Sequence, residues 1–241
     1  MLITEKDRKL NISFSNDDNA DIALYKDENG PRARIGSAIY GDSSPESSLW
    51  ESGSGDHSVQ TKDAGNFAEG DFSVAEGLNT IARSDFSHTE GWVTRTIIDT
   101  TDPDTHGHAS HAEGSHTIAK GAASHAEGNT TESIGWYSHA EGSGCVSGGN
   151  SSHAEGDGTL TNNFAEHAEG TYNKSTPSSS SKAKDGTLHS VGIGTAMNNR
   201  KNAYEVMQNG DIYVIGIGGY DGTNVSEAQT LQEVIKSLLD K

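Results

Sequence analysis

Apolar and small residues recur every seven positions through the middle of the chain. Segments such as 66–70, 124–128 and 131–135 mostly place an apolar residue or His second and always place Ala, Thr or Ser third. Thirteen such segments can be counted between residues 66 and 170. Seven residues are too few for a helix with its turn, but they fit a short strand and a tight corner. The pattern predicts half-turns, two per 14-residue coil, with Gly or Asn supplying the positive φ of each corner.

The strictest form of the repeat is Ser-His-Ala-Glu-Gly, which returns every fourteen residues. Its His-Ala-Glu-Gly parts occupy 111–114, 125–128, 139–142, 153–156 and, as a variant, 167–170. A strict period is typical of a solenoid, in which each unit packs on copies of itself. Since alternate residues of a strand point to opposite sides, the second and fourth positions share a face.

The two faces of these strands are expected to have different roles. We expect the apolar second positions to fill the coil: Phe67, Val74, Ile81, Ile118, Val146 and Leu160. The small third position indicates that another backbone approaches closely on the other face.

Composition limits what one coil can bury. Only 31% of the residues are hydrophobic, and the mean hydropathy is −0.67. A narrow coil of this kind buries little apolar surface to offset its ordering entropy. Three chains side by side would bury the small-residue face and protect the sheet edges. We therefore predict a homotrimer.

The repeat also resembles known families. It is similar to the head repeat of trimeric autotransporter adhesins, whose unit is Ser-Val-Ala-Ile-Gly. Its Ser-His-Ala-Glu-Gly runs resemble more closely those in fibre and appendage proteins of tailed bacteriophages. The resemblance covers 58–170 and extends into 188–194, 199–204 and 209–214. It implies a mainly all-β fold, namely a trimeric left-handed parallel β-roll of 14-residue coils. In some such phage proteins a self-cleaving peptidase domain follows, which we do not expect in this chain.

The remaining sequence predicts four regions. Residues 1–57 lack the repeat, and their alternating apolar positions and turn signals predict a small β-rich anchor domain. The repeat shaft covers 58–170, with an excursion at 92–108 where the spacing between repeats exceeds one coil. A Ser-rich segment at 171–186 is predicted to be a linker. Residues 187–241 are expected to form a C-terminal β-hairpin and helix cap.

Local signals support this C-terminal prediction. Asn209-Gly210 lies between two apolar runs, which favours a hairpin turn. Thr230 and Glu233 have the spacing of a capping box before a short helix. The helix carries one apolar stripe at i, i+3 and i+4 spacing, which indicates a small three-helix cap: Leu231, Val234, Ile235, Leu238 and Leu239.

The recurring His-x-Glu pair is the main candidate for chemistry. An imidazole and a carboxylate two residues apart can hydrogen-bond along or between coils, and they are also half of a metal site. Because a catalytic or metal site is normally built once, the repetition favours a structural ladder over metal binding or catalysis. We assign no catalytic, cofactor-binding or metal-binding residue, and we expect no cofactor.

The excursion is the second candidate. Its acidic and imidazole side chains match no established metal-site spacing, so a solvated loop is the favoured interpretation over a calcium or transition-metal site: Asp99, Asp102, Asp104, His106 and His108. The aromatic residues Trp92, Trp136 and Tyr137 are candidates for stacking on a sugar, with packing between coils or chains as the alternative.

Charge restricts the partners. The formal net charge of −18 argues against nucleic acid and anionic membranes, and no apolar run is long enough for a membrane span. We expect no signal peptide, because charged residues fill positions 5–9. The single cysteine, Cys145, excludes an intrachain disulfide framework.

The sequence and the resemblance together predict a structural virion protein without enzyme activity. We expect a homotrimeric phage fibre or appendage, on the head or the tail, that is made in the host cytoplasm. Its N-terminal domain would bind other virion proteins of the capsid, neck or tail, and a host surface glycan or protein is a further candidate partner. The alternatives are a bacterial trimeric adhesin-like surface protein and a glycan-degrading or self-processing appendage enzyme.

Overall fold

The computed structural model describes residues 2–6, 9–13, 22–27, 30–35, 38–41, 49–97, 107–180, 183–225 and 228–240. The chain forms two compact units, Met1–Leu49 and Trp50–Lys241. The first unit holds a five-stranded antiparallel sheet in sequential order. Its strands are β1 (Leu2–Lys6), β2 (Lys9–Ser13), β3 (Ile22–Asp27), β4 (Gly30–Ile35) and β5 (Ala38–Gly41).

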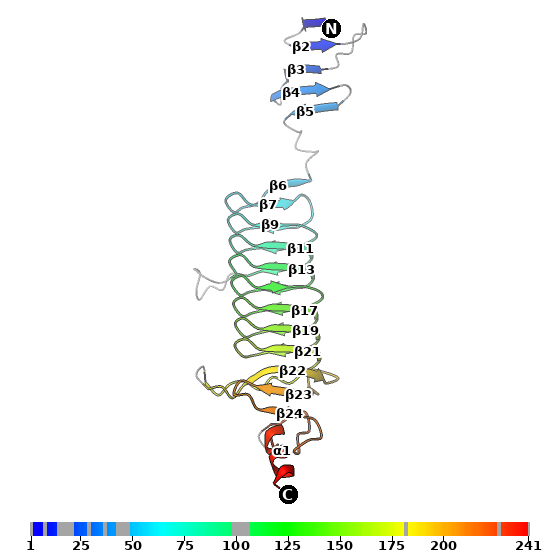
Figure 1. Cartoon of the computed structure of the whole chain (residues 1–241). Helices are drawn as coiled ribbons and strands as arrows, with labels where there is room; N and C mark the ends of the chain where they lie inside the picture. Colours follow the sequence, from blue (N-terminus) through cyan, green and yellow to red (C-terminus); the bar gives the residue numbers. More distant parts are fainter. Residues whose placement is uncertain are drawn as a thin grey trace. The chain divides into compact units, whose positions relative to one another are not determined.

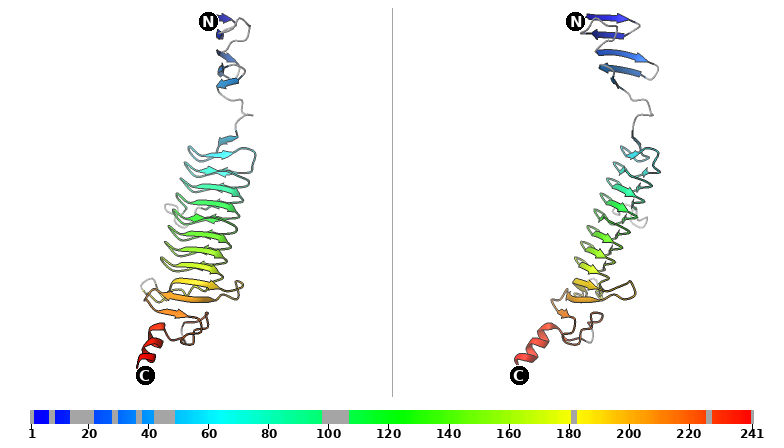
Figure 2. Two further views of the ribbon diagram at one scale, coloured as in Figure 1. Left: turned by 45° about the vertical axis from the view of Figure 1, so that its right-hand side comes forward. Right: turned by 90° about the vertical axis from the view of Figure 1, so that its right-hand side faces the viewer.

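In the second unit the chain passes alternately through two sheets (Figures 1 and 2). The seven-stranded sheet is parallel and contains β8 (Phe67–Ala68), β10 (Ile81–Ala82), β12 (Arg95–Thr96), β14 (Ile118–Ala119), β16 (Glu132–Ser133), β18 (Val146–Ser147) and β20 (Leu160–Thr161). The parallel part of the twelve-stranded sheet contains β7 (Val59–Thr61), β9 (Val74–Ala75), β11 (His88–Trp92), β13 (His111–Ser115), β15 (His125–Ala126), β17 (His139–Ser143), β19 (His153–Asp157), β21 (His167–Thr171) and β22 (Thr187–Ile193). Antiparallel strands complete its two ends, namely β6 (Trp50–Ser52) at one and β23 (Asn202–Met207) and β24 (Ile212–Val214) at the other.

The strand register follows the 14-residue period. Ala112 pairs with Ala126 in one sheet, and Ile118 pairs with Glu132 in the other. Each coil therefore lies on the next with equivalent positions in line. The architecture is mainly β with one short helix, as predicted, and it is compatible with a β-roll.

One half-turn escaped the sequence analysis. Strand β12 pairs with β10 and β14, so the coil continues through Ile97 before the chain departs from it. The apolar second position is occupied here by Arg95, which hid the repeat. Residues 92–97 of the excursion predicted at 92–108 therefore belong to the coil. The residues Asp99, Asp102, Asp104 and His106 lie outside the described residues.

The side of the strand that faces the interior is opposite to our expectation. The third-position alanines are fully buried between the two sheets, and Ala75 packs with Ala68 and Ala82 of the facing sheet. The second positions point outward, and Phe67 keeps 54% of its surface exposed. The prediction that second-position residues fill the coil is therefore wrong, because the sheets lie too close together to admit more than small side chains.

Hydroxyl groups complete this interior. The first position is mostly Ser or Thr, and these residues are buried. Ser138 Oγ donates to the carbonyl of Gly135 at 2.6 Å, and Ser152 Oγ donates likewise to Gly149. The interior is thus small and polar. Some of its hydroxyls bind corner carbonyls, whereas others among the described residues, such as those of Thr94, Ser124 and Thr159, are buried without a hydrogen-bond partner.

Glycine is required where coils approach most closely. Gly142 has φ +100°, and a Cβ atom built on it would lie 2.2 Å from the carbonyl oxygen of Gly156 in the next coil. Other corner positions with positive φ carry side chains, among them Phe86 and Tyr137. The expectation that Gly or Asn supplies every positive φ is therefore wrong, since these corners lie in the left-handed helical region that other residues tolerate at modest cost.

The C-terminal elements match their sequence signals. Strands β23 and β24 pair antiparallel, and α1 (Leu231–Leu239) begins at Thr230 with the predicted capping box to Glu233. The segment predicted as a linker packs against the last coil, because Asn173 is fully buried and bonds both the N–H and the carbonyl of Leu160. No helix of the described residues is long and apolar enough to cross a membrane.

Candidate functional site: the histidine–glutamate ladder

The outward face of the twelve-stranded sheet carries a stack of imidazole rings. Neighbouring rings lie 4.7–5.1 Å apart between centroids and within 11° of parallel. The stack contains His88, His111, His125, His139, His153, His167 and His189. The spacing follows from parallel register, since each ring occupies the second position of its coil.

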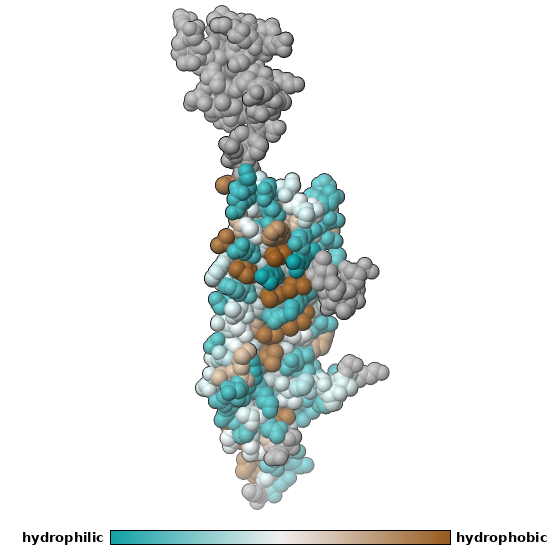
Figure 3. Space-filling view, turned by 180° about the vertical axis from the view of Figure 1, so that it is seen from behind, coloured by the Kyte–Doolittle hydropathy of each residue, from teal (hydrophilic) through white to brown (hydrophobic). Residues whose placement is uncertain are grey.

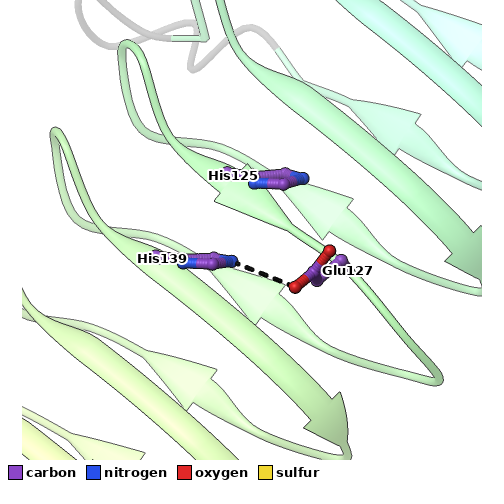
Figure 4. A group of neighbouring side chains, drawn as sticks. All are labelled: His125, Glu127 and His139. Atoms are coloured by element: carbon purple, nitrogen blue, oxygen red, sulfur yellow. Dashed lines mark ion pairs between the residues drawn. The ribbon is translucent and has the colours of Figure 1, made fainter.

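Each paired imidazole faces a glutamate of the preceding coil. The Nε2 atom of His139 lies 3.6 Å from Oε1 of Glu127, as Figure 4 shows. Five further steps repeat this geometry at 3.2–3.5 Å, namely His88–Glu76, His125–Glu113, His153–Glu141, His167–Glu155 and His189–Glu169. Of the two directions that the sequence left open, the contacts run between coils. We call this set of imidazoles and carboxylates the ladder.

Most Nε2 atoms of the ladder are buried although the imidazole rings that carry them are partly exposed. The paired His side chains keep 30–40% of their surface. Five Nε2 atoms are nevertheless buried with no hydrogen-bond partner among the described residues, those of His111, His125, His139, His153 and His189. Burial, together with neighbouring imidazoles, lowers the pKa of His111 and His153, which favours neutral rings there.

The glutamates of the ladder interact with one another. Hydrogen bonds to Glu90 and Glu127, with burial and charge repulsion, raise the pKa of Glu113 to about 7. Hydrogen bonds to Glu113 and Glu76 lower the pKa of Glu90, and those to Glu141 and Glu113 lower that of Glu127. Glu113 therefore takes up a proton more readily than Glu90 or Glu127.

Four groups in the ladder have the composition of a metal site. In each, three ligand atoms lie within 4.8 Å of one another. The groups are Glu76–His88–Glu90, Glu90–His111–Glu113, His125–Glu127–His139 and His139–Glu141–His153. Imidazole nitrogen and carboxylate oxygen are both ligands of first-row divalent metals.

The outward face of the seven-stranded sheet has a different character. Each of its seven coils places one large apolar residue outward, at the second or the fourth position. We call these residues the apolar row: Phe67, Ile81, Ile97, Ile118, Ile134, Val146 and Leu160. Where the second position is charged, as at Arg95 and Glu132, the fourth is Ile. Figure 3 shows hydrophobic side chains gathered along the shaft on the face opposite to that of Figure 1.

Positive charge accompanies the apolar row. Between residues 66 and 170 the sequence has three Lys or Arg residues, Arg83, Arg95 and Lys120, all at second or fourth positions of this sheet. Arg83 pairs with Glu69 at 2.9 Å, and Lys120 pairs with Glu132. The two outward faces therefore differ in charge as well as in hydropathy.

The aromatic candidates for sugar stacking lie at separate places. Trp92 ends β11, where its ring packs edge-on against His116. Tyr137 is two-thirds exposed at a corner after β16, next to Trp136. Cys145 is buried and contacts the carbonyl of Gly156 at 3.2 Å, so it serves as a small interior residue.

Sequence reasoning missed two buried acids, Glu166 and Glu205. Glu166 is 1% exposed, and its Oε2 accepts bonds from the backbone N–H groups of Asn162 and Asn163 and from Ser175. Burial raises its pKa to about 7, although these hydrogen bonds oppose the rise. The signal was its place at the first position of the variant repeat, where the other His-containing repeats have Ser.

Comparison of the chain with protein-family models, curated proteins and solved structures finds no significant match.

Proposed function

We propose that the chain is the subunit of a homotrimeric structural fibre or appendage of a tailed bacteriophage, built as a left-handed parallel β-roll. The apolar row carries this proposal. One chain leaves the row facing outward along the whole seven-stranded sheet, and Phe67 and Ile134 are 54% and 40% exposed. A contiguous apolar strip of this length favours a protein partner.

The energy available from the row supports a stable oligomer. Phe67 and Ile134 keep about half of their surface exposed, and the other five residues of the row keep less. Burying what remains contributes about 1 kcal/mol for each of the two and about 0.5 kcal/mol for each of the others, so the row contributes roughly 4 kcal/mol per chain. The small interior supports such an assembly, because the coil itself buries little more than alanine and hydroxyl groups.

The chemistry beside the row is suited to copies of the same chain. Arg95 lies along it in a chain of net charge −18 and can pair with an acid of a neighbouring copy, whereas Arg83 and Lys120 already pair with Glu69 and Glu132 within the chain. At the other end of the unit, α1 leaves Ile235, Leu238 and Leu239 exposed. Three such helices can cover one another in the predicted cap.

Sedimentation equilibrium of the full chain at micromolar concentration tests the assembly. The expected mass is 3 × 25.4 = 76.2 kDa. The double variant Ile118→Asp, Val146→Asp should sediment as a monomer, because it places unpaired carboxylates in the row. Met197→Asp is the control, since Met197 is 74% exposed outside the row. A wild-type monomer, or a double variant that remains trimeric, contradicts the proposal.

The biological role needs a separate experiment. Electron microscopy of purified phage particles labelled with an antibody to this chain should place it on a head or tail fibre. Label confined to the surface of bacterial cells would instead support the adhesin-like alternative. That the chain has no enzyme activity, and that its N-terminal unit binds other virion proteins, stay predictions.

A further inference from the structure

We propose that the ladder binds divalent transition-metal ions, each held by an imidazole Nε2 and by carboxylate oxygens from adjacent coils. Zn²⁺ is the representative ion, because nitrogen and oxygen ligands suit it and its preferred coordination is tetrahedral. The inference rests on the ladder alone and does not depend on the trimer or on the phage role.

The distances in the ladder suit a bridging ion. Zinc binds imidazole nitrogen at about 2.0–2.1 Å and carboxylate oxygen at about 2.0–2.2 Å, so two ligands at the tetrahedral angle are roughly 3.4 Å apart. The six nitrogen–oxygen pairs of the ladder are 3.2–3.6 Å apart. An ion can therefore enter between these atoms with little movement of the backbone.

The nitrogen atoms also lack any other partner. Nε2 of His111, His125 and His139 is buried without a hydrogen bond although it lies near a carboxylate. A buried polar atom without a partner is unfavourable, and a metal ion would satisfy it. No Lys or Arg between residues 66 and 170 lies on this face to compete, because Arg83, Arg95 and Lys120 all lie on the other sheet.

Shared ligands fix the number of ions. Two of the four groups share Glu90, and the other two share His139. Each residue of a group offers one ligand atom, so the residue that two adjacent groups share serves one ion at a time. We therefore expect one ion in each overlapping pair, which gives two ions per chain.

The stacked rings define the coordination. The rings of His125 and His139 are parallel at 4.8 Å, so both Nε2 lone pairs cannot point at one ion. The core of that site is therefore the shared Nε2 of His139 with the carboxylates of Glu127 and Glu141, one from each of its two groups, and water completes it on the exposed side. In the first pair of groups, one imidazole lies between two carboxylates, as in Glu76–His88–Glu90.

Calorimetric titration of the chelator-treated full chain with ZnCl₂ at about pH 7.5 tests the proposal, because neutral imidazole is the binding form. The wild type should bind two ions per chain. Glu90→Gln and His139→Gln should each bind one, and the double variant should bind none at these groups. Glu69→Gln and His116→Gln are the matched controls, because they change the same residue types outside the ladder, and both should bind two ions.

Two further measurements make the result decisive. Circular dichroism and sedimentation of each variant show whether the shaft is intact. If the double variant does not fold, the zinc stoichiometry of the two single variants tests the proposal. Zinc should raise the melting temperature of the wild type more than that of the variants, whereas Mg²⁺ should not, since it prefers all-oxygen sites. The proposal is overturned if no saturable binding is seen up to about 100 µM zinc, a concentration that corresponds to a binding free energy of about −5.5 kcal/mol. Unchanged stoichiometry in both single variants overturns it equally.

Discussion

Two glycines of one coil should respond very differently to the same methyl group. In Gly142→Ala the new Cβ would lie 2.2 Å from the carbonyl oxygen of Gly156, whereas real Cβ atoms stay at least 3.0 Å away. Neighbouring coils must therefore separate by at least 3.0 − 2.2 = 0.8 Å at this point. In Gly144→Ala the nearest atom is Thr130 Oγ1 at 3.9 Å, so the methyl group makes only ordinary van der Waals contact.

Backbone conformation increases the difference. Gly142 has φ +100°, outside the left-handed helical region, whereas Gly144 has φ +62°, within it. Thr130 occupies the position of Gly144 one coil earlier with φ +55°, so the corner accepts a side chain. Crowding costs about 1–3 kcal/mol, and the disfavoured backbone about 1–2 kcal/mol. We expect about 3 kcal/mol for Gly142→Ala, where both costs apply, and about 1 kcal/mol for Gly144→Ala, where only the left-handed backbone is disfavoured.

Thermal unfolding followed by circular dichroism measures both variants. For a chain of this length, 1 kcal/mol lowers the melting temperature by about 2–4 °C, so Gly142→Ala should melt about 6–12 °C below the wild type. Gly144→Ala should lie within about 4 °C of it. Equal decreases for the two variants would refute the reasoning that close coil approach, rather than loss of glycine as such, governs this position.

Two other predictions concern the C-terminal part of the shaft and its helix. The pKa of Glu166 is raised to about 7 by burial, so its proton stabilises the fold at low pH, and this contribution is lost as the pH rises from the ordinary 4.5 through 7. Urea midpoints at about pH 5.5 and 8 should therefore differ less in Glu166→Gln than in the wild type, and an unchanged difference would contradict the buried-acid reasoning. Thr230→Ala removes the capping box and should destabilise α1 by about 1 kcal/mol, whereas Thr230→Ser should preserve it. Hydrogen exchange of the first amides of α1 measures this effect, and equal protection in both variants would argue against the cap.

The sequence predicted the period, the strands, the hairpin and the capped helix, because each has a local signal. It did not predict which side of the strands is buried. Alternation separates the faces of a strand but does not say which one is inside, and we assigned the larger side chains to the interior as in an ordinary core. Here the sheets are close enough that Ala75 touches both Ala68 and Ala82, so only the small face fits. The small third position in every copy carried this information.

The chemical features were harder to predict for a related reason. Arg95 concealed a half-turn because outward positions do not have to be apolar once the interior is filled by Thr94 and Thr96. The ladder was visible as His-x-Glu pairs, but its contacts join different coils. Pairing of His139 with Glu127 depends on strand register, which a single repeat does not contain. The burial of the Nε2 atoms likewise requires the stacked neighbours.

The two outward faces can differ because the interior uses only the first and third positions. Packing of the interior therefore does not restrict the residue type at the second and fourth positions. Alternate half-turns place these positions on opposite sheets. One sheet acquires His and Glu at these positions, and the other acquires one large apolar residue per coil. The apolar residue moves to the fourth position where the second is charged, so every coil keeps one. Ile97 follows Arg95 in this way, and Ile134 follows Glu132. A face maintained in this way is best explained by a partner that covers it along its length, whereas the ladder, on the opposite sheet, is left accessible to ions. Assembly and ion binding are therefore expected to be separable. Ile118→Asp should abolish trimer assembly without changing the number of zinc ions bound per chain.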